Sequence, residues 1–106
     1  MELRKRIEGN CFKVWLGEKF LFSDHEQFRA VIDAVKSKDE IQTVHIYLNA
    51  LEFLDSSALG MLLLMRDVTD NIDKKIVLHN PQGQVKKLFE ISCFYDLFQI
   101  ENDKES

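Results

Sequence analysis

Two short runs of strand-forming residues, separated by a helix-length apolar segment, constrain the fold of this chain most strongly. The runs are residues 43–48 (Thr-Val-His-Ile-Tyr-Leu) and 75–80 (Lys-Ile-Val-Leu-His-Asn), and both have the length and residue types of strands in a sheet core. Residues 57–70 lie between them and are predicted to form a helix. A strand, a helix and a second strand in this order predict parallel neighbours joined by a right-handed crossover.

Two further helices are predicted on either side of this unit. The first covers residues 24–37 and repeats apolar side chains at the spacing of one buried helical face: Phe28, Val31, Ile32 and Val35. Ser23 with Glu26 three residues later matches the capping box of a helix start. The second covers residues 82–92 and follows Pro81, which cannot donate to a continuing strand ladder.

The start of the chain is predicted to contain a β-hairpin. Residues 11–16 form its first strand, residues 17–19 its turn and residues 20–22 its second strand. A last short turn or helix is expected at residues 96–98, before a polar tail at 101–106. We therefore expect one α/β domain over residues 1–106, with its core in about 11–100. The expected architecture is a mixed, mostly parallel central sheet of four to five strands with helices packed on it.

Composition narrows the possible functions of the chain. With 14 Lys+Arg against 18 Asp+Glu, the net charge is −4, which argues against nucleic acid as a partner. The charges of Arg4-Lys5-Arg6 are interpreted as solvated terminal residues. No apolar run approaches the roughly 18 residues of a membrane span, and none follows the N-terminus at signal-peptide length. A cytoplasmic location is therefore expected.

Few features point to a metal, a cofactor or catalysis. Cys11 and Cys93 stand far apart and are interpreted as two small buried apolar residues in a reducing compartment. No His/Asp/Glu cluster has metal-ligand spacing and no glycine-rich phosphate loop is present, so we expect neither metal nor cofactor. The motif G-x-S-x-G is absent. His25, His45 and His79 are interpreted as surface or strand residues, so the chain is not expected to be an enzyme.

The tandem serines of the run Asp55-Ser56-Ser57 have two compatible interpretations. Ser56 or Ser57 is a candidate cap for the exposed N–H groups of the helix that begins there. The same helix N-terminus is also a favourable place for a phosphate group.

Residues 54–60 (Leu-Asp-Ser-Ser-Ala-Leu-Gly) resemble the phosphorylation loop of the STAS family, the bacterial anti-sigma factor antagonists. Two other segments agree with this resemblance. Asn80-Pro81 and the closing Leu97-Phe98-Gln99-Ile100 are similar to the end of the family's domain, and Gly17-Glu18 is similar to its early turn. The resemblance covers about residues 11–100 and implies the STAS fold.

The resemblance implies a function in partner switching. Ser56 is implied as the phosphoacceptor, with Ser57 as the second candidate and with Asp55, Ser57 and Gly60 as the supporting loop. The unmodified protein would bind a serine protein kinase or anti-sigma factor-like regulator, phosphorylation would release it, and a PP2C-type phosphatase would reset the switch. The alternative is a constitutive STAS-like structural subunit of a larger complex, such as a lipid transporter, in which the serine only caps the helix.

The candidates for the partner surface lie on the helix that follows these serines. They are Leu59, Met61, Leu64 and Met65. We expect Leu59, Leu62 and Leu63 to face the sheet, and Met61 and Leu64 to face outward beside Ser56.

Two positions depart from the pattern of the STAS family. Phe20 stands where the family's early turn often has an aspartate, and Asp24, at the helix start, is counted among the partner-binding candidates. Cys93 stands where glycine is common. Either the exit from the preceding helix differs, or Cys93 accepts a strained backbone.

Overall fold

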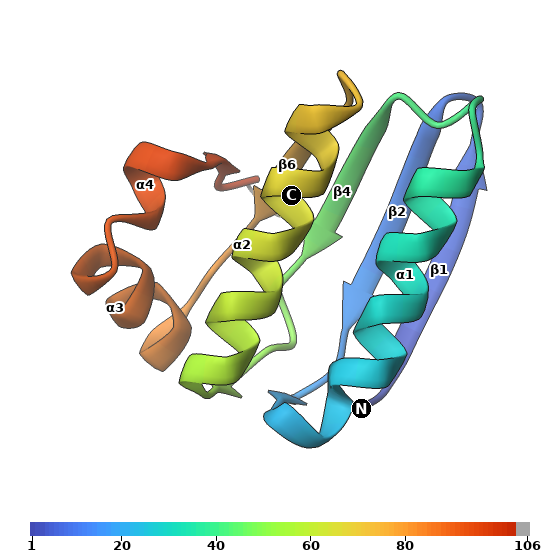
Figure 1. Ribbon diagram of the computed structural model, residues 1–106. Helices are drawn as coiled ribbons and strands as arrows, with labels where there is room; N and C mark the ends of the chain where they lie inside the picture. Colours follow the sequence, from blue (N-terminus) through green and yellow to red (C-terminus); the bar gives the residue numbers. More distant parts are fainter. Residues whose placement is uncertain (104–106) are drawn as a thin grey trace.

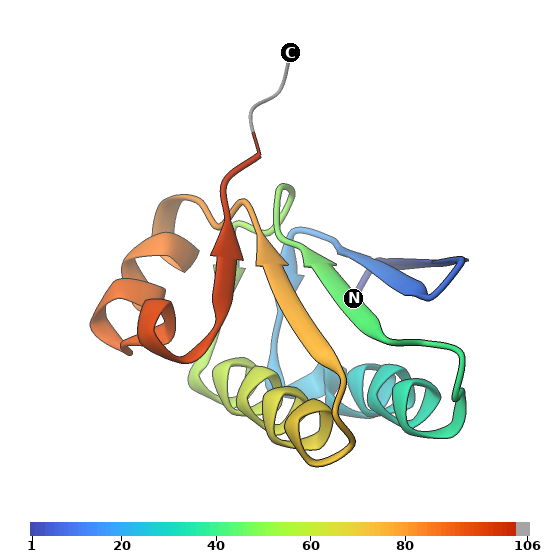
Figure 2. The same ribbon diagram turned by 90° about the horizontal axis from the view of Figure 1, so that it is seen from above.

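A five-stranded sheet covered on one face by two long helices forms the centre of the computed structural model, which describes residues 1–103 (Figures 1 and 2). Across the sheet the strands lie in the order β1 (Leu3–Glu8), β2 (Cys11–Leu16), β4 (Thr43–Tyr47), β6 (Lys75–His79) and β7 (Gln99–Glu101). Strand β1 is antiparallel to β2, and the other neighbours are parallel. The predicted mixed, mostly parallel α/β sheet is confirmed.

The remaining elements surround this sheet. They are the 3₁₀ helix η1 (Phe22–Asp24), the helices α1 (His25–Ser37), α2 (Ser56–Asn71), α3 (Gly83–Ile91) and α4 (Phe94–Leu97), and the short strands β3 (Lys19–Phe20) and β5 (Phe53–Leu54). Figure 2 shows α1 and α2 side by side on one face, with α3 and α4 beside the β7 edge. In the part of the chain that the structure describes, no helix covers the opposite face, and none is long and apolar enough to cross a membrane.

The alternation of side chains along the strands separates a core face from an open face. In β4, Val44 and Ile46 are fully buried, whereas His45 and Tyr47 point to the opposite side and keep partial exposure. The core face receives the predicted stripe of α1, namely Phe28, Val31, Ile32 and Val35, and the stripe of α2, namely Ala58, Leu62, Met65 and Thr69. Because Met65 lies on this stripe and is fully buried, its prediction as a partner-surface residue was wrong.

The predicted hairpin was wrong in its second strand. Strand β2 pairs with β1, which precedes it, through a turn at Gly9-Asn10 in which Gly9 has a φ of 59°. Residues 20–22 instead divide between β3 and η1. Strand β1 is a charged edge strand whose side chains are mostly exposed, so it shows no apolar alternation. The Gly-Asn turn was the available sequence signal.

The predicted start of the first helix and the predicted tail also differ from the structure. Helix α1 begins at His25, and Ser23 lies inside η1, so the capping box predicted from Ser23 was wrong. Instead, the Asp24 carboxylate accepts the N–H of Leu21 at 2.8 Å. Of the predicted tail, Glu101 belongs to β7 and Asp103 is bound to Asn80; residues 104–106 lie outside the described residues.

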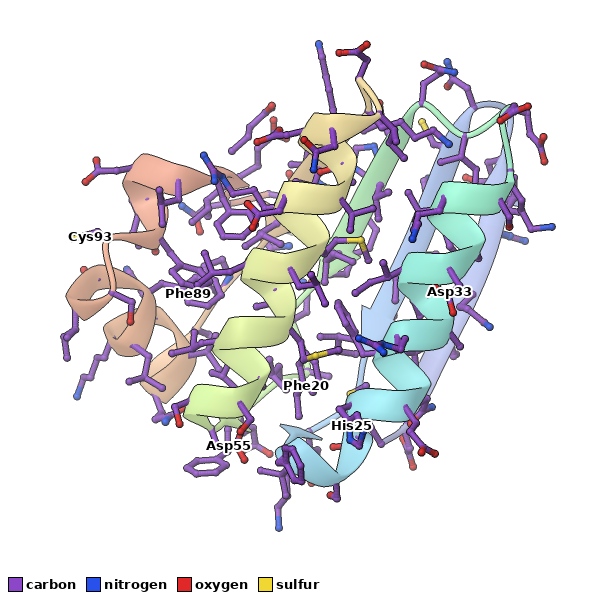
Figure 3. All side chains as sticks on the ribbon, viewed as in Figure 1. Phe20, His25, Asp33, Asp55, Phe89 and Cys93 are labelled. Atoms are coloured by element: carbon purple, nitrogen blue, oxygen red, sulfur yellow. The ribbon has the colours of Figure 1, made fainter. Side chains whose placement is uncertain are left out.

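Cys93 lies on the connection between α3 and α4 (Figure 3) and has a left-handed backbone, with φ 60° and ψ 27°. Its side chain is exposed and that of Cys11 is only partly buried, so the expectation that both cysteines are buried was wrong. Of the two alternatives that the sequence left open, the structure therefore has the strained cysteine. A residue with a Cβ in this conformation costs about 1–2 kcal/mol, which the fold tolerates in order to turn from α3 into α4.

Cys93→Gly is expected to raise the free energy of unfolding by about 0.5–1 kcal/mol, because glycine removes the strain but increases the entropy of the unfolded chain. Urea denaturation measures the change. Cys93→Ala is the matched control, since it removes the thiol but keeps the Cβ, and it should leave stability unchanged. An equal gain in both variants would attribute the effect to the thiol and contradict the strain argument.

Candidate functional site

The side chain of Asp55 organises the start of α2. Its Oδ1 accepts the N–H of Ala58 at 2.9 Å, which makes Asp55 the N-cap of the helix. Its Oδ2 accepts the N–H of Phe22 at 3.0 Å. The expectation that Ser56 or Ser57 caps the helix was therefore wrong, because these residues are the first two of the helix itself. One carboxylate both caps α2 and fastens the segment before α1 to it.

Asp24 holds the other end of that segment. Its Oδ2 accepts the N–H of Leu21 at 2.8 Å, and its Oδ1 lies 2.9 Å from the amine of Met1. Burial by itself would raise the pKa of Asp24, but the Leu21 hydrogen bond and the Met1 amine outweigh burial and lower it. The side chain is 12% exposed. As a partner-binding candidate, Asp24 thus has its carboxylate engaged within the chain.

Two short parallel strands, β3 and β5, pair directly before the serine-containing segment that leads into α2. Phe20 of β3 pairs with Leu54 of β5, and both side chains are fully buried. The Phe20 ring also packs on Phe28 of α1, with ring centroids 4.9 Å apart. From α3, the Gln84 amide accepts the N–H of Leu54 at 3.4 Å and donates to its carbonyl at 3.3 Å. Phe20, at the position where an aspartate was expected, is therefore a core residue that anchors the site.

Ser56 and Ser57, which follow Asp55, are both exposed to solvent. Among residues 1–103, neither hydroxyl makes a hydrogen bond to another protein group, because Asp55 already serves as the cap. Both lie in the first turn of α2, where unpaired N–H groups give a positive end to the helix dipole. The structure thus presents two accessible hydroxyls at the positive end of the helix dipole, where the neighbouring Asp55 carboxylate acts against the binding of an anion.

Exposed apolar side chains lie at the same end of the molecule. Phe22, whose N–H is bound by Asp55, is 63% exposed, and Phe53, two residues before Asp55, is 44% exposed. Gly60 and Leu64 follow Ser56 at successive intervals of four residues and therefore share its helical face. Exposed apolar side chains thus lie on both sides of the serines, Phe22 and Phe53 before them and Leu64 after them.

The predicted facing of α2 is confirmed in part. Leu62 is buried and Leu64 is exposed, as expected. Leu59 and Leu63 are half-buried and pack against the core. Met61, expected to face outward, is also half-buried against the core, because it lies on the flank of the helix rather than on its outer face.

The histidines make their contacts elsewhere. His25 lies at the same end as Asp55 (Figure 3), but its Nδ1 is 3.0 Å from the Phe22 carbonyl oxygen and its ring stacks on Phe22. His45 and His79 bind each other on the open face of the sheet, at 2.8 Å between ring nitrogens. Burial, followed by the charges of His79 and Lys13, lowers the pKa of His45. Within residues 1–103, no histidine makes a hydrogen bond to Ser56.

Comparisons with known proteins identify the family to which this chain is similar. The family model described as the STAS domain matches residues 2–106. A STAS-domain containing protein of Pseudomonas aeruginosa is 36% identical over 93 residues, covering 88% of this chain and 90% of the relative. A Bordetella bronchiseptica protein named as a candidate anti-sigma factor antagonist, BtrV, is 30% identical over 81 residues, covering 76% of this chain and 69% of the relative.

Among solved structures, that of the Bacillus cell fate determinant SpoIIAA in its phosphorylated form superposes with a TM-score of 0.78. The alignment covers 98% of this chain and 93% of the SpoIIAA chain at 20% identity, which supports the shared fold. The match of the family model over nearly the whole sequence and the two relatives lead to one conclusion: the chain belongs to the STAS domain family.

Proposed function

We propose that this chain is an anti-sigma factor antagonist-like regulator that changes partners when Ser56 is phosphorylated. The observation that carries the proposal is an exposed serine hydroxyl, without a protein hydrogen bond among the described residues, on the first residue of α2. Two comparisons support it: BtrV is named as a candidate anti-sigma factor antagonist, and SpoIIAA has a phosphorylated form. The unmodified protein would bind a serine protein kinase or anti-sigma factor-like regulator.

The geometry explains why a phosphate at Ser56 would act on binding rather than on folding. A phosphate adds about −1.5 to −2 charges, and Ser56 is exposed, so the phosphate would remain in water in the free protein. The loop beneath it is held by bonds that do not involve the Ser56 hydroxyl, from Asp55 to Ala58 and Phe22. Phosphorylation is therefore expected to leave the fold unchanged.

In a complex the same phosphate would be costly. A partner that covers Phe22, Phe53 and the outer side of α2 would also enclose Ser56, and burying an unpaired charge against apolar groups costs several kcal/mol. Each 1.4 kcal/mol is a factor of ten in affinity. A PP2C-type phosphatase would remove the group and restore binding.

The first test identifies the acceptor. After incubation with the cognate kinase and ATP, intact-mass measurement should show one added phosphate on the wild-type protein and on Ser57→Ala. Ser56→Ala should gain none. Ser57→Ala is the matched control because it removes the neighbouring exposed hydroxyl from the same helical turn. Phosphate on Ser56→Ala would assign the site to another residue.

The second test separates switching from a constitutive structural role. In pull-downs with the partner, Ser56→Ala should bind and Ser56→Asp should bind at least tenfold more weakly, because the carboxylate introduces charge into the interface. Equal binding by the two variants is the result expected of a constitutive subunit, and would remove the switch.

The third test locates the partner surface. Leu64→Gln is expected to weaken partner binding about tenfold, which is 1.4 kcal/mol, while stability changes by no more than about 0.5 kcal/mol. Ile72→Gln is the matched control, since Ile72 is 37% exposed against 36% for Leu64 but lies beyond the opposite end of α2. Isothermal titration calorimetry measures both. Equal effects of the two substitutions would place the partner elsewhere.

A further inference from the structure

The open face of the sheet carries a row of side chains that the proposed switch does not use. Register places Trp15, Tyr47, His79 and Glu101 beside one another on four successive strands. The rings of Trp15 and Tyr47 stack at 5.1 Å, and those of Tyr47 and His79 stack at 4.5 Å. His79 is therefore held in a fixed orientation at the end of an aromatic row, and only 5% of it is exposed.

Two carboxylates reach this buried imidazole from the end of the chain. Glu101 is the direct neighbour of His79 in the ladder, and Asp103 comes two residues later. Asp103 Oδ2 lies 2.9 Å from His79 Nδ1. One potential ligand atom from each of His79, Glu101 and Asp103 lies within 4.8 Å of the others. Within residues 1–103, neither carboxylate is paired with a lysine or arginine.

We propose that His79, Glu101 and Asp103 form a binding site for a divalent transition-metal ion such as Zn²⁺ or Co²⁺. One imidazole nitrogen and two carboxylate oxygens are a ligand set that these ions accept, with water in the remaining positions. The 2.9 Å between His79 Nδ1 and Asp103 Oδ2 is the length of a hydrogen bond, so an ion bound to Nδ1 would replace the proton between them. The two atoms would then move to the roughly 3.4 Å that a tetrahedral ion with bonds of about 2.1 Å requires.

Neighbouring groups already orient the ligands. The Nε2 of His79 lies 2.8 Å from His45 Nδ1, so with Nδ1 on the metal, Nε2–H donates to His45. Metal-bound histidines characteristically have such an outer hydrogen-bond partner. Asn80 fixes the backbone beside the carboxylates: its N–H donates to the Glu101 carbonyl at 2.8 Å, and its Oδ1 accepts the Asp103 N–H at 2.6 Å.

The site would fasten β7 and the residues after it to β6. It lies on the sheet face opposite α1 and α2, since His79 is paired with Tyr47, which points to the open face. This face is away from the partner surface proposed on α2. The metal site is therefore independent of phosphorylation at Ser56, and the two proposals fail separately.

Isothermal titration calorimetry of the full, tag-free chain with ZnCl₂ tests the site. The expected result is one ion per chain, with binding weakened at least tenfold in Glu101→Gln and in Asp103→Asn. These two substitutions remove surface carboxylates, so the variants should keep the wild-type circular dichroism spectrum. His79→Ala should also lose the ion, but its buried position makes it the secondary variant.

Two controls make the result specific. His25→Ala removes a partly exposed histidine outside the site and should bind Zn²⁺ like the wild type, as should Ser56→Ala. With CoCl₂, the wild type should show visible d–d absorption of a nitrogen- and oxygen-ligated ion, and Asp103→Asn should lose it. Absence of saturable binding, or equal binding by the wild type, Glu101→Gln and Asp103→Asn, would overturn the proposal.

Discussion

The two hydrogen bonds accepted by the Asp55 carboxylate are the interaction on which the candidate site depends. One bond, from Ala58, starts α2, and the other, from Phe22, fixes the segment that leads into α1. Because Asp55 caps the helix, the hydroxyls of Ser56 and Ser57 are not needed to bind its first N–H groups. Chemical modification of Ser56 can then change the surface charge without removing a bond that the fold needs.

The sheet gives the molecule two different faces. Its core face is covered by α1 and α2, and the exposed side of α2 carries Leu64 on the same helical face as Ser56. Its open face carries the aromatic row and the cluster around His79. Since side chains alternate along each strand, neighbouring residues such as Ile46 and Tyr47 serve opposite faces. One small sheet thereby supports the proposed partner surface on one side and a separate candidate ligand site on the other.

Prediction succeeded where a signal was local in sequence and failed where it depended on distant residues. The stripe of α1 and the strand β4 were evident because burial imposes a period of 3.6 or 2 on a continuous segment. Strand β1 was missed because a charged edge strand has no such period. The Asp55 cap was missed because Asp, Ser and Ser all favour the same position, and only backbone geometry selects among them. The His79 cluster was not predicted because His79 belongs to β6, whereas Glu101 and Asp103 lie in and just after β7, more than twenty residues later in the sequence.

The sequence by itself determined the α/β class, the order of the principal helices and strands, and a serine-containing helix start that resembles the STAS family. Local propensity and apolar periodicity suffice for these, since both act within a few residues. Only the tertiary structure decided which residue caps α2, that Phe20 anchors the loop from the core, and that Cys93 bears a left-handed backbone. Phe20 and the second bond of Asp55, from Phe22, depend on contacts between segments far apart in the chain. The choice of Asp55 as cap and the backbone of Cys93 depend on local backbone geometry that residue types alone do not specify.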